Sequence, residues 1–263
     1  MPYFPQFATG AVSQFPCTKR LVRRTVTNAT EDGGLLKIFD PGGSMVEWDL
    51  ELSGLNANEW GELDNLFESA EGQLGAFVFL DPFSNLLAWS EDLTAAVWSS
   101  DSGLTVNPGV ADGFGGNRAS RLQNQSQAEA GVRQTIAVPA WFQYCLSLYA
   151  RSDQPCEVRL SAAAGQGTAS TQFPAGPTWR RFESATQPGG QAEAVTFGVS
   201  VEAGSAVEIY GLQAEPQRGA SAYKKTTTRN ALYTGASFAT DELTLQSDSA
   251  NEYSCRVRIR ALG

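Results

Sequence analysis

The chain has 263 residues, and its 28 acidic residues outnumber its 19 basic ones to give a net charge of −9. This balance excludes nucleic-acid binding through bulk positive charge. It contains no histidine, which excludes Ser-His-Asp and Cys-His catalytic sites. No apolar run reaches the roughly 18–20 residues of a membrane span. The N-terminus also lacks the basic and apolar regions of a secretory signal, so we expect the chain to be made in a cytosol.

The four cysteines give no sign of a metal site or a disulfide. Cys17, Cys145, Cys156 and Cys255 lie far apart in the sequence, and without histidine or a close cysteine pair no zinc site is expected. Cys145 and Cys156 flank a predicted hairpin turn, where Cys156 would face about Arg151 instead of Cys145. We therefore expect buried thiols, and neither a metal nor a cofactor.

The N-terminal part begins with an irregular aromatic segment, residues 2–16, and continues with a predicted hairpin. An aromatic segment without periodicity is either disordered or ordered on a neighbouring subunit, and its four aromatic residues favour the second. The hairpin consists of strands at 19–27 and 35–39, joined by a turn over 31–34.

A strand at 44–52 and a helix follow. Val46, Trp48, Leu50 and Leu52 alternate with acidic residues, which predicts one face in a core and one row of carboxylates. The acidic row is Glu47, Asp49 and Glu51. The helix is predicted from a capping box at Asn56 and Glu59 to a left-handed glycine at Gly72. A short apolar strand over 76–80 stops at Asp81-Pro82, where we expect one domain to be interrupted by another.

The C-terminal residues again alternate apolar and charged side chains, as the N-terminal part does. A strand pair is predicted within 236–245, and the run 253–260 alternates apolar residues with Arg256, Arg258 and Arg260. The arginine row and the acidic row either pair across neighbouring strands of one sheet or meet between identical subunits, as head-to-tail ring contacts require. Under the second interpretation all six residues lie at a subunit interface.

Residues 85–216 show no helical stripe and predict a domain of short strands separated by Gly, Pro and Asn turns. The predicted strands are 131–138, 142–151, 156–162, 179–185, 194–201 and 206–212. The predicted fold is mainly β. A split β-barrel or β-sandwich domain with one α-helix (1–84 plus 217–263, ring-forming) is interrupted by an inserted β-sandwich, or jelly-roll, domain (85–216).

The sequence offers no catalytic motif, so we predict that the protein is not an enzyme. Neither a nucleotide-binding loop nor a carboxylate pair is placed by any spacing. Exposed aromatic residues of the insert are candidates for stacking on sugar rings, although most tryptophans of a β-sandwich lie in its core. The predicted carbohydrate-binding residues are Trp141, Tyr149, Arg151 and Arg118.

Several stretches of the insert resemble carbohydrate-binding-module-like jelly rolls, which also recur in phage structural proteins. They are Asn85–Leu93, Trp98, Arg133–Ile136, Tyr144–Arg151, Thr178–Arg181 and Ile209–Glu215. Ala222–Thr226 also resembles the end of such a module, which would place the end of the insert nearer residue 226 than 216. The flanking parts resemble the distal tail protein of long-tailed bacteriophages and prophages. The matching stretches there are Gly10–Pro16, the strand–helix segment that ends in Phe77–Pro82, and the arginine-edged C-terminal strand.

This resemblance implies a virion protein made in the host cytoplasm. Copies of the chain, commonly six, would form a ring that joins the tail tube protein to the tip hub protein, with DNA crossing the central channel. The insert would then face outward and contact host-surface glycans. Two alternatives are a stand-alone carbohydrate-binding protein and a glycan-degrading enzyme, disfavoured by the missing secretion signal and the missing acid–base pair respectively.

Overall fold

The two strands with the clearest alternation pair with each other in the computed structural model, which describes residues 1–263. β2 (Leu35–Leu55) and β16 (Glu252–Leu262) are antiparallel neighbours. They belong to unit 1, which comprises residues 1–8, 12–80 and 232–263. Unit 2 comprises residues 9–11 and 81–231. The predicted fold class is confirmed: the protein is mainly β, with one helix and an inserted β-sandwich.

One antiparallel sheet of unit 1 takes strands from both ends of the chain. Its order is β1-β2-β16-β14-β3, and β15 pairs with the first part of β16 on the side away from β2, while β14 pairs with the last part. The remaining bounds are β1 (Cys17–Ala29), β3 (Phe77–Leu80), β14 (Leu232–Phe238) and β15 (Leu245–Ser249). The 217–231 segment, which we expected in this outer domain, lies in unit 2 instead, for a reason given with the site below.

Aromatic rings form much of the core of unit 1. Trp48 on β2, which is 1% exposed, packs at 4.9 Å from the ring of Phe79 and at 4.7 Å from the ring of Tyr233. Phe4 lies 5.4 Å from Phe79, and its backbone N–H donates to the carbonyl of Val78. The expectation that the N-terminal segment is disordered or ordered on a neighbouring subunit is therefore wrong for its first part. Its aromatic residues fill the core of their own chain.

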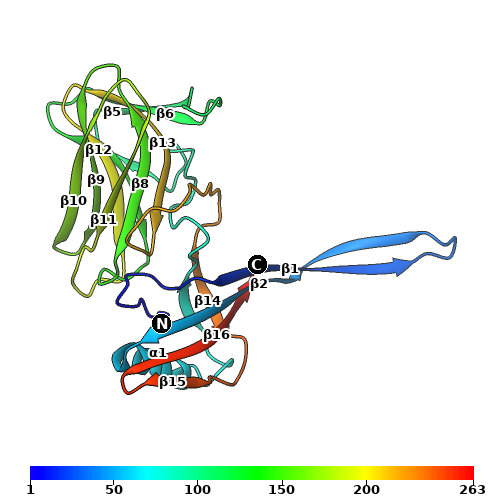
Figure 1. Ribbon diagram of the computed structural model, residues 1–263. Coiled ribbons are helices and arrows are strands. Elements are labelled where there is room, and N and C mark those ends of the chain that lie inside the picture. The colour runs from blue at the N-terminus through cyan, green and yellow to red at the C-terminus, as the bar shows by residue number, and fades with distance from the viewer. The chain divides into compact units, whose positions relative to one another are not determined.

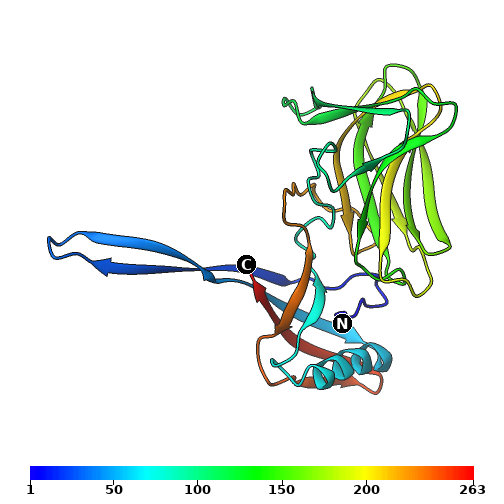
Figure 2. The ribbon, with the colours of Figure 1, turned by 180° about the vertical axis from the view of Figure 1, so that it is seen from behind.

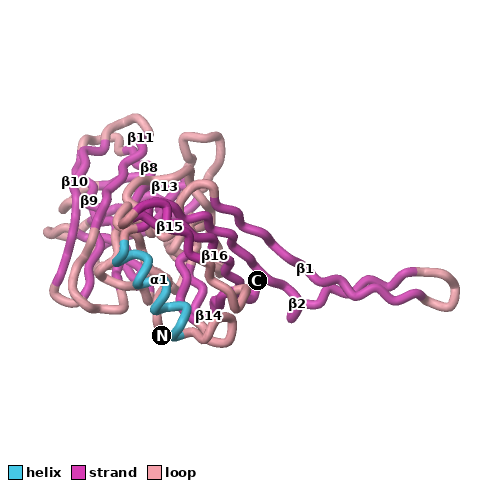
Figure 3. Tube along the Cα trace, turned by 60° about the horizontal axis from the view of Figure 1, so that its bottom comes forward, coloured by secondary structure: helices cyan, strands magenta, loops and turns pink.

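The helix α1 (Ala57–Ser69) begins at the predicted capping box. The Asn56 side chain accepts from the N–H groups of Asn58 and Glu59, while the Glu59 carboxylate accepts from the N–H of Asn56. Gly72 has the expected left-handed backbone, with φ of 63°. Leu63 and Leu66 turn inward, and Figure 3 shows the helix lying against the sheet of unit 1. This helix is neither long nor apolar enough to cross a membrane.

The outer halves of β1 and β2 form a hairpin that no other element of the chain covers. We call residues 24–40 the arm; its pairs run from Arg24 opposite Asp40 to Ala29 opposite Leu35. Figure 2 shows the arm extending from the sheet of unit 1 without folding back. Residues 23–39 are exposed on both faces of this hairpin. The exposed apolar side chains of the arm are Val26, Leu35, Leu36, Ile38 and Phe39.

Unit 2 is a sandwich of two antiparallel sheets (Figure 1). We call β10-β9-β12-β7-β4 sheet A and β11-β8-β13-β6-β5 sheet B. Apolar residues of both sheets meet between them; for example, the rings of Tyr144 and Phe197 lie 5.2 Å apart. The strands of sheet A are β4 (Ser99–Ser100), β7 (Ala130–Ile136), β9 (Cys156–Ala164), β10 (Gly167–Ala175) and β12 (Val195–Val201). The strands of sheet B are β5 (Leu104–Val110), β6 (Ala119–Asn124), β8 (Tyr144–Arg151), β11 (Arg180–Thr186) and β13 (Ala206–Glu215).

Three of the cysteines are buried thiols. Cys145 and Cys156 lie in unit 2, and Cys255 lies in unit 1. Burial raises the pKa of the Cys145 thiol to about 12 and that of Cys255 to about 11. Both groups are therefore held in the thiol form at neutral pH, whereas the thiolate is the reactive form.

Candidate functional site

The outer face of sheet B, turned away from sheet A, gathers aromatic and arginine side chains. Side chains alternate along β8: Leu146, Leu148 and Ala150 enter the core, so Tyr149 and Arg151 point outward. The register places Tyr149 beside Arg181 of β11 on one side and beside Tyr210 of β13 on the other. Three neighbouring strands therefore present large side chains at the same level of the sheet.

Four rings form what we call the aromatic cluster: Phe114, Tyr149, Tyr210 and Tyr223. Phe114 lies edge-on to Tyr149, with the ring centres 4.9 Å apart. Tyr210 lies 6.0 Å from Tyr149 and 5.2 Å from Tyr223. Phe114 remains 56% exposed, which leaves an aromatic surface open to solvent. Aromatic faces of this kind stack on flat apolar groups of a ligand.

Arginines lie over the rings of this face. The guanidinium of Arg118 lies 4.7 Å from the ring centre of Tyr210, and that of Arg181 lies 5.5 Å from Tyr149. Arg151 lies 5.7 Å from the ring of Trp179, which precedes β11. Such cation–π contacts hold the rings in place, and each guanidinium carries several N–H donors on a fixed plane. The face thus combines flat apolar surfaces with hydrogen-bond donors.

Asp112 organises the loop that carries Phe114. Its carboxylate accepts from the backbone N–H of Phe114 at 2.8 Å, from that of Gly116 at 3.0 Å, and from Arg118 Nε at 2.7 Å. The bond from Arg118, followed by those from the backbone N–H groups of Gly116 and Phe114, holds the pKa of Asp112 well below its usual range. Gly113 permits close packing of this loop, because a Cβ atom there would lie 2.7 Å from the Trp179 ring.

The lowered pKa of Asp112 predicts an acid-sensitive loop. A carboxylate whose pKa is depressed on folding stabilises the fold above its unfolded pKa of about 3.9, and that stabilisation is lost as the pH falls toward the folded pKa. We expect Asp112→Asn to lower the melting temperature above about pH 4, with the difference from wild type shrinking at lower pH. Melting curves from pH 2 to 7 measure this. A matched control is Asp153→Asn, at an exposed aspartate; an equal loss in the control would contradict the prediction.

A second carboxylate of this face is buried between arginines. Glu208 on β13 is 7% exposed. Its Oε2 accepts from Arg151 Nε, and its Oε1 lies 3.4 Å from Arg121 Nη1. Asp112 and Glu208 each accept a hydrogen bond from an arginine of this face. The two carboxylates therefore position guanidinium groups.

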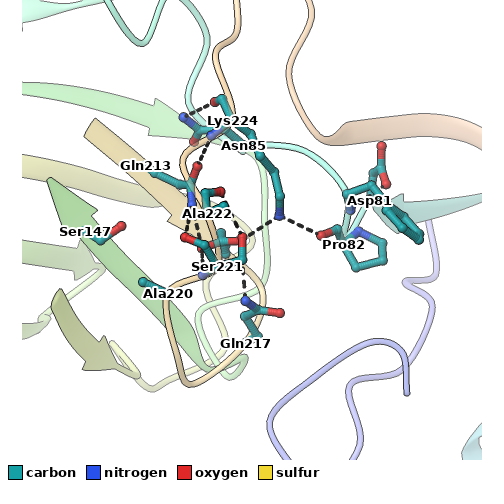
Figure 4. A network of polar contacts seen from close by, with 12 residues as sticks. Asp81, Pro82, Asn85, Ser147, Gln213, Gln217, Ala220, Ser221, Ala222 and Lys224 are labelled. Carbon is teal, nitrogen blue, oxygen red and sulfur yellow. Dashed lines mark hydrogen bonds and ion pairs between the residues drawn. The ribbon is translucent and has the colours of Figure 1, made fainter. Parts of the chain in front are cut away.

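The segment 216–226 crosses the outer face of sheet B and is fixed there by a polar network (Figure 4). The Lys224 ammonium donates to Glu215 Oε1 at 2.8 Å and to the carbonyl of Pro82 at 2.9 Å. The Ser221 carbonyl accepts from Arg181. Asn85 joins the start of unit 2 to β13 through bonds to the carbonyl of Leu212 and the N–H of Ala214. These bonds explain why the residues after 216 belong to unit 2.

The structure brings together three of the four predicted carbohydrate-binding residues. Tyr149, Arg151 and Arg118 all lie on the outer face of sheet B. Trp141 lies apart from them, before the other end of β8; its ring packs on Phe142 at 6.2 Å and its carbonyl accepts from Gln187.

Phe114, Tyr210 and Arg181 were not predicted to belong to this site. Phe114 lies in the Gly-rich stretch 112–116, which predicts only a turn. Tyr210 lies on β13, where the neighbouring apolar residues indicate a core strand.

On unit 1, the acidic row and the arginine row lie on one face of the same sheet. The register pairs Arg256 with Glu51, Arg258 with Asp49, and Arg260 with Glu47. Arg256 forms an ion pair with Asp49, and Arg20 of β1 forms one with Glu47 at 3.1 Å. The rows therefore meet within one chain, as the cross-strand interpretation predicted. Arg260 instead donates to Gln73 at 3.0 Å.

A cavity of about 350 Å³ opens on this charged face of unit 1. We call it the arginine cavity. It is lined by Thr18, Arg20, Glu47, Trp48, Asp49, Ala239, Thr240, Arg256, Arg258 and Ile259. No group of three or more potential metal ligands is close enough anywhere in the structure to hold an ion.

The fold of unit 2 is that of a jelly-roll β-sandwich. No protein-family model and no curated protein matches the chain. Among solved structures, the chain is similar to the first CBM22 xylan-binding domain of Xyn10C from Paenibacillus barcinonensis. The identity is 14%, the TM-score is 0.44, and the match covers 54% of this chain and 99% of that one.

Two further structures are similar. The tandem CBM22 domains of the same Paenibacillus protein match at 13% identity and a TM-score of 0.45, covering 66% of this chain and 61% of that one. The enzymatically active domain of tailspike protein 4 from bacteriophage CBA120 matches at 15% identity and a TM-score of 0.40. That match covers 52% of this chain and 22% of the tailspike chain.

Proposed function

We propose that this chain is a non-enzymatic structural subunit that assembles with copies of itself, and more specifically a distal tail component of a long-tailed bacteriophage. The observation that carries the proposal is the arm. Leu35 is 66% exposed, Phe39 56% and Ile38 48%, and these residues belong to a hairpin that no other element of its own chain covers. Two-stranded hairpins are marginally stable alone. Exposed apolar patches and open strand edges are typical of interaction surfaces.

The stretches resembling distal tail proteins support the more specific assignment. They include the apolar run Phe77–Pro82, which forms β3 and the exit toward unit 2, and the arginine-edged β16. In this proposal, unit 1 forms a ring of commonly six copies between a tail tube protein and a tip hub protein. DNA passes through the channel, and the chain resides in the virion.

The oligomeric state of the purified full chain tests the proposal. We expect its mass in sedimentation velocity to rise with concentration toward a closed oligomer, and electron micrographs of negatively stained particles to show rings. A chain that stays monomeric at all concentrations would rule out self-assembly through the arm. Open filaments in place of rings would keep self-assembly and reject the ring.

The outer face of sheet B favours a second function, glycan binding by unit 2. This face presents the aromatic cluster, Trp179 and arginine donors together. Sugars offer flat apolar C–H faces for stacking and hydroxyls for hydrogen bonds, which this combination fits. Glycan binding serves either a peripheral host-contacting module of the tail or a stand-alone carbohydrate-binding protein. A glycan-degrading enzyme is not proposed, because Asp112 and Glu208 are each held by arginines.

A glycan array with the full chain tests this second function. We expect Trp179→Ala and Tyr149→Ala to weaken binding about tenfold or more, at about 1.4 kcal/mol or more for a lost stacking contact. Trp141→Ala is the matched control, because this tryptophan lies apart from the cluster, and it should bind as wild type does. Equal losses in all three variants would indicate a general folding defect, and no bound glycan would reject the function.

A further inference from the structure

The arginine cavity of unit 1 contains more positive than negative side chains. Of its three guanidiniums, Arg20 pairs with Glu47 and Arg256 pairs with Asp49. Arg258 is exposed and has no carboxylate within ion-pair distance, although it lies opposite Asp49 and helps to lower the pKa of Asp49, after the larger effect of Arg256. Thr18 and Thr240 line the same cavity, and the Thr240 hydroxyl donates to the carbonyl of Glu242. The Arg258 guanidinium is therefore the donor that suits one additional carboxylate.

The tip of the arm carries an exposed carboxylate of this kind. In the turn from Thr30 to Gly34, Asp32 is engaged within the turn: it accepts from Thr30 Oγ1 at 2.5 Å and from the Gly34 N–H at 3.3 Å. Glu31 is exposed and makes no hydrogen bond or ion pair. Because Asp32 shapes the turn, Glu31 is the acidic group at the tip that remains available to a partner.

The tip of the arm cannot reach the cavity of its own chain. Arg20 lines the cavity at the base of the hairpin. The eleven-residue step from Arg20 to Glu31 spans about 36 Å in an extended strand. Figure 2 shows the hairpin running outward from the sheet of unit 1. A contact between the two therefore requires a second copy.

We propose that the arm of one copy places Glu31 in the arginine cavity of the next copy, where its carboxylate pairs with Arg258. This inference rests on the self-assembly proposed above and names the two surfaces that meet. The apolar side chains of the arm supply the buried area, while the charge pair sets the register of the contact. The tip and the cavity are different surfaces of one chain, so the contact is head-to-tail. Such contacts close into a ring when the rotation between successive copies is a whole fraction of a full turn.

Charge exchange tests the pairing. In sedimentation velocity on the full chain, we expect Glu31→Arg and Arg258→Glu each to raise the apparent dissociation constant about tenfold. The double variant, with both changes in the same chain, should return to within about threefold of wild type. Glu68→Arg, on the exposed side of α1, is the matched control with the same charge change and should assemble normally. Thermal melting verifies that Arg258→Glu is folded.

Crosslinking gives a second readout that does not depend on the charge at Arg258. Chains with Glu31→Cys and chains with Arg258→Cys, each in a Cys17→Ser background, are mixed under mild oxidation. The expected product is a disulfide between the two kinds of chain. An assembling wild type with unaffected charge variants and no crosslink would overturn the pairing and leave the proposed function standing. A wild type that never assembles would overturn both.

Discussion

A chain with a polar arm should remain monomeric at concentrations where the wild type assembles. Val26, Leu36 and Ile38 lie on one face of the hairpin, because Val26 is opposite Ile38 and Leu36 is opposite Asn28. At about 1 kcal/mol lost for each buried apolar side chain, Val26→Thr, Leu36→Thr and Ile38→Thr together raise the dissociation constant more than about a hundredfold. Sedimentation velocity across a concentration series measures the change.

The opposite face of the arm provides the matched comparison. Leu35→Thr and Phe39→Thr change the other side of the same hairpin. If each set of substitutions abolishes assembly, both faces of the arm are buried by neighbouring copies. If only one set abolishes assembly, only the face that carries it is buried. Neither set should change the melting temperature of the monomer, because these side chains are exposed in the single chain. Normal assembly of both variants would contradict the role of the arm.

Removing the Trp48 side chain should destabilise unit 1 by about 3–5 kcal/mol. Trp48 packs against Phe79 from β3 and Tyr233 from β14, so its ring joins strands from both ends of the chain. Trp48→Ala leaves a cavity where those strands meet. Urea unfolding followed by circular dichroism measures the loss, and the transition of unit 2 serves as an internal reference.

Phe15→Ala is the control for this measurement. Phe15 belongs to the same unit and is 94% exposed, so its removal should change the free energy of unfolding by less than about 0.5 kcal/mol. If Trp48→Ala lowers the free energy of unfolding as little as Phe15→Ala does, the Trp48 ring does not hold the N-terminal and C-terminal parts of unit 1 together.

The parts of the fold that were predicted from the sequence have strong local signals. The alternation over 44–52 and 253–260 marks β2 and β16, and the capping box at Asn56 marks the start of α1. β10 was missed because its sequence is rich in Gly, Ala, Ser and Thr and carries little apolar alternation. β5 was missed because Asn107-Pro-Gly predicts a turn. The structure accommodates Pro108 in an edge strand, with a register shift beside it.

Other features depend on contacts between distant residues. Phe4 reaches the core of unit 1 by pairing with Val78, which no local pattern of residues 2–16 indicates. Likewise, Lys224 fixes the end of unit 2 through Glu215 and Pro82. The candidate site was predicted only in part, because some of its residues come together through contacts between distant segments. Tyr149 and Arg151 share a recognisable strand, whereas Phe114 reaches them on a glycine loop shaped by Asp112.

The pairing of β3 with β14 brings together the two points between which unit 2 is inserted. Leu80 and Leu232, the last and first residues of unit 1 on either side of the 151-residue excursion from Asp81 to Ala231, are direct antiparallel partners. Antiparallel strands that end side by side need only a two-residue turn to connect them. The host sheet thus has the connectivity of an ordinary hairpin. Joining Leu80 to Leu232 by such a turn would therefore keep every strand of this sheet in place.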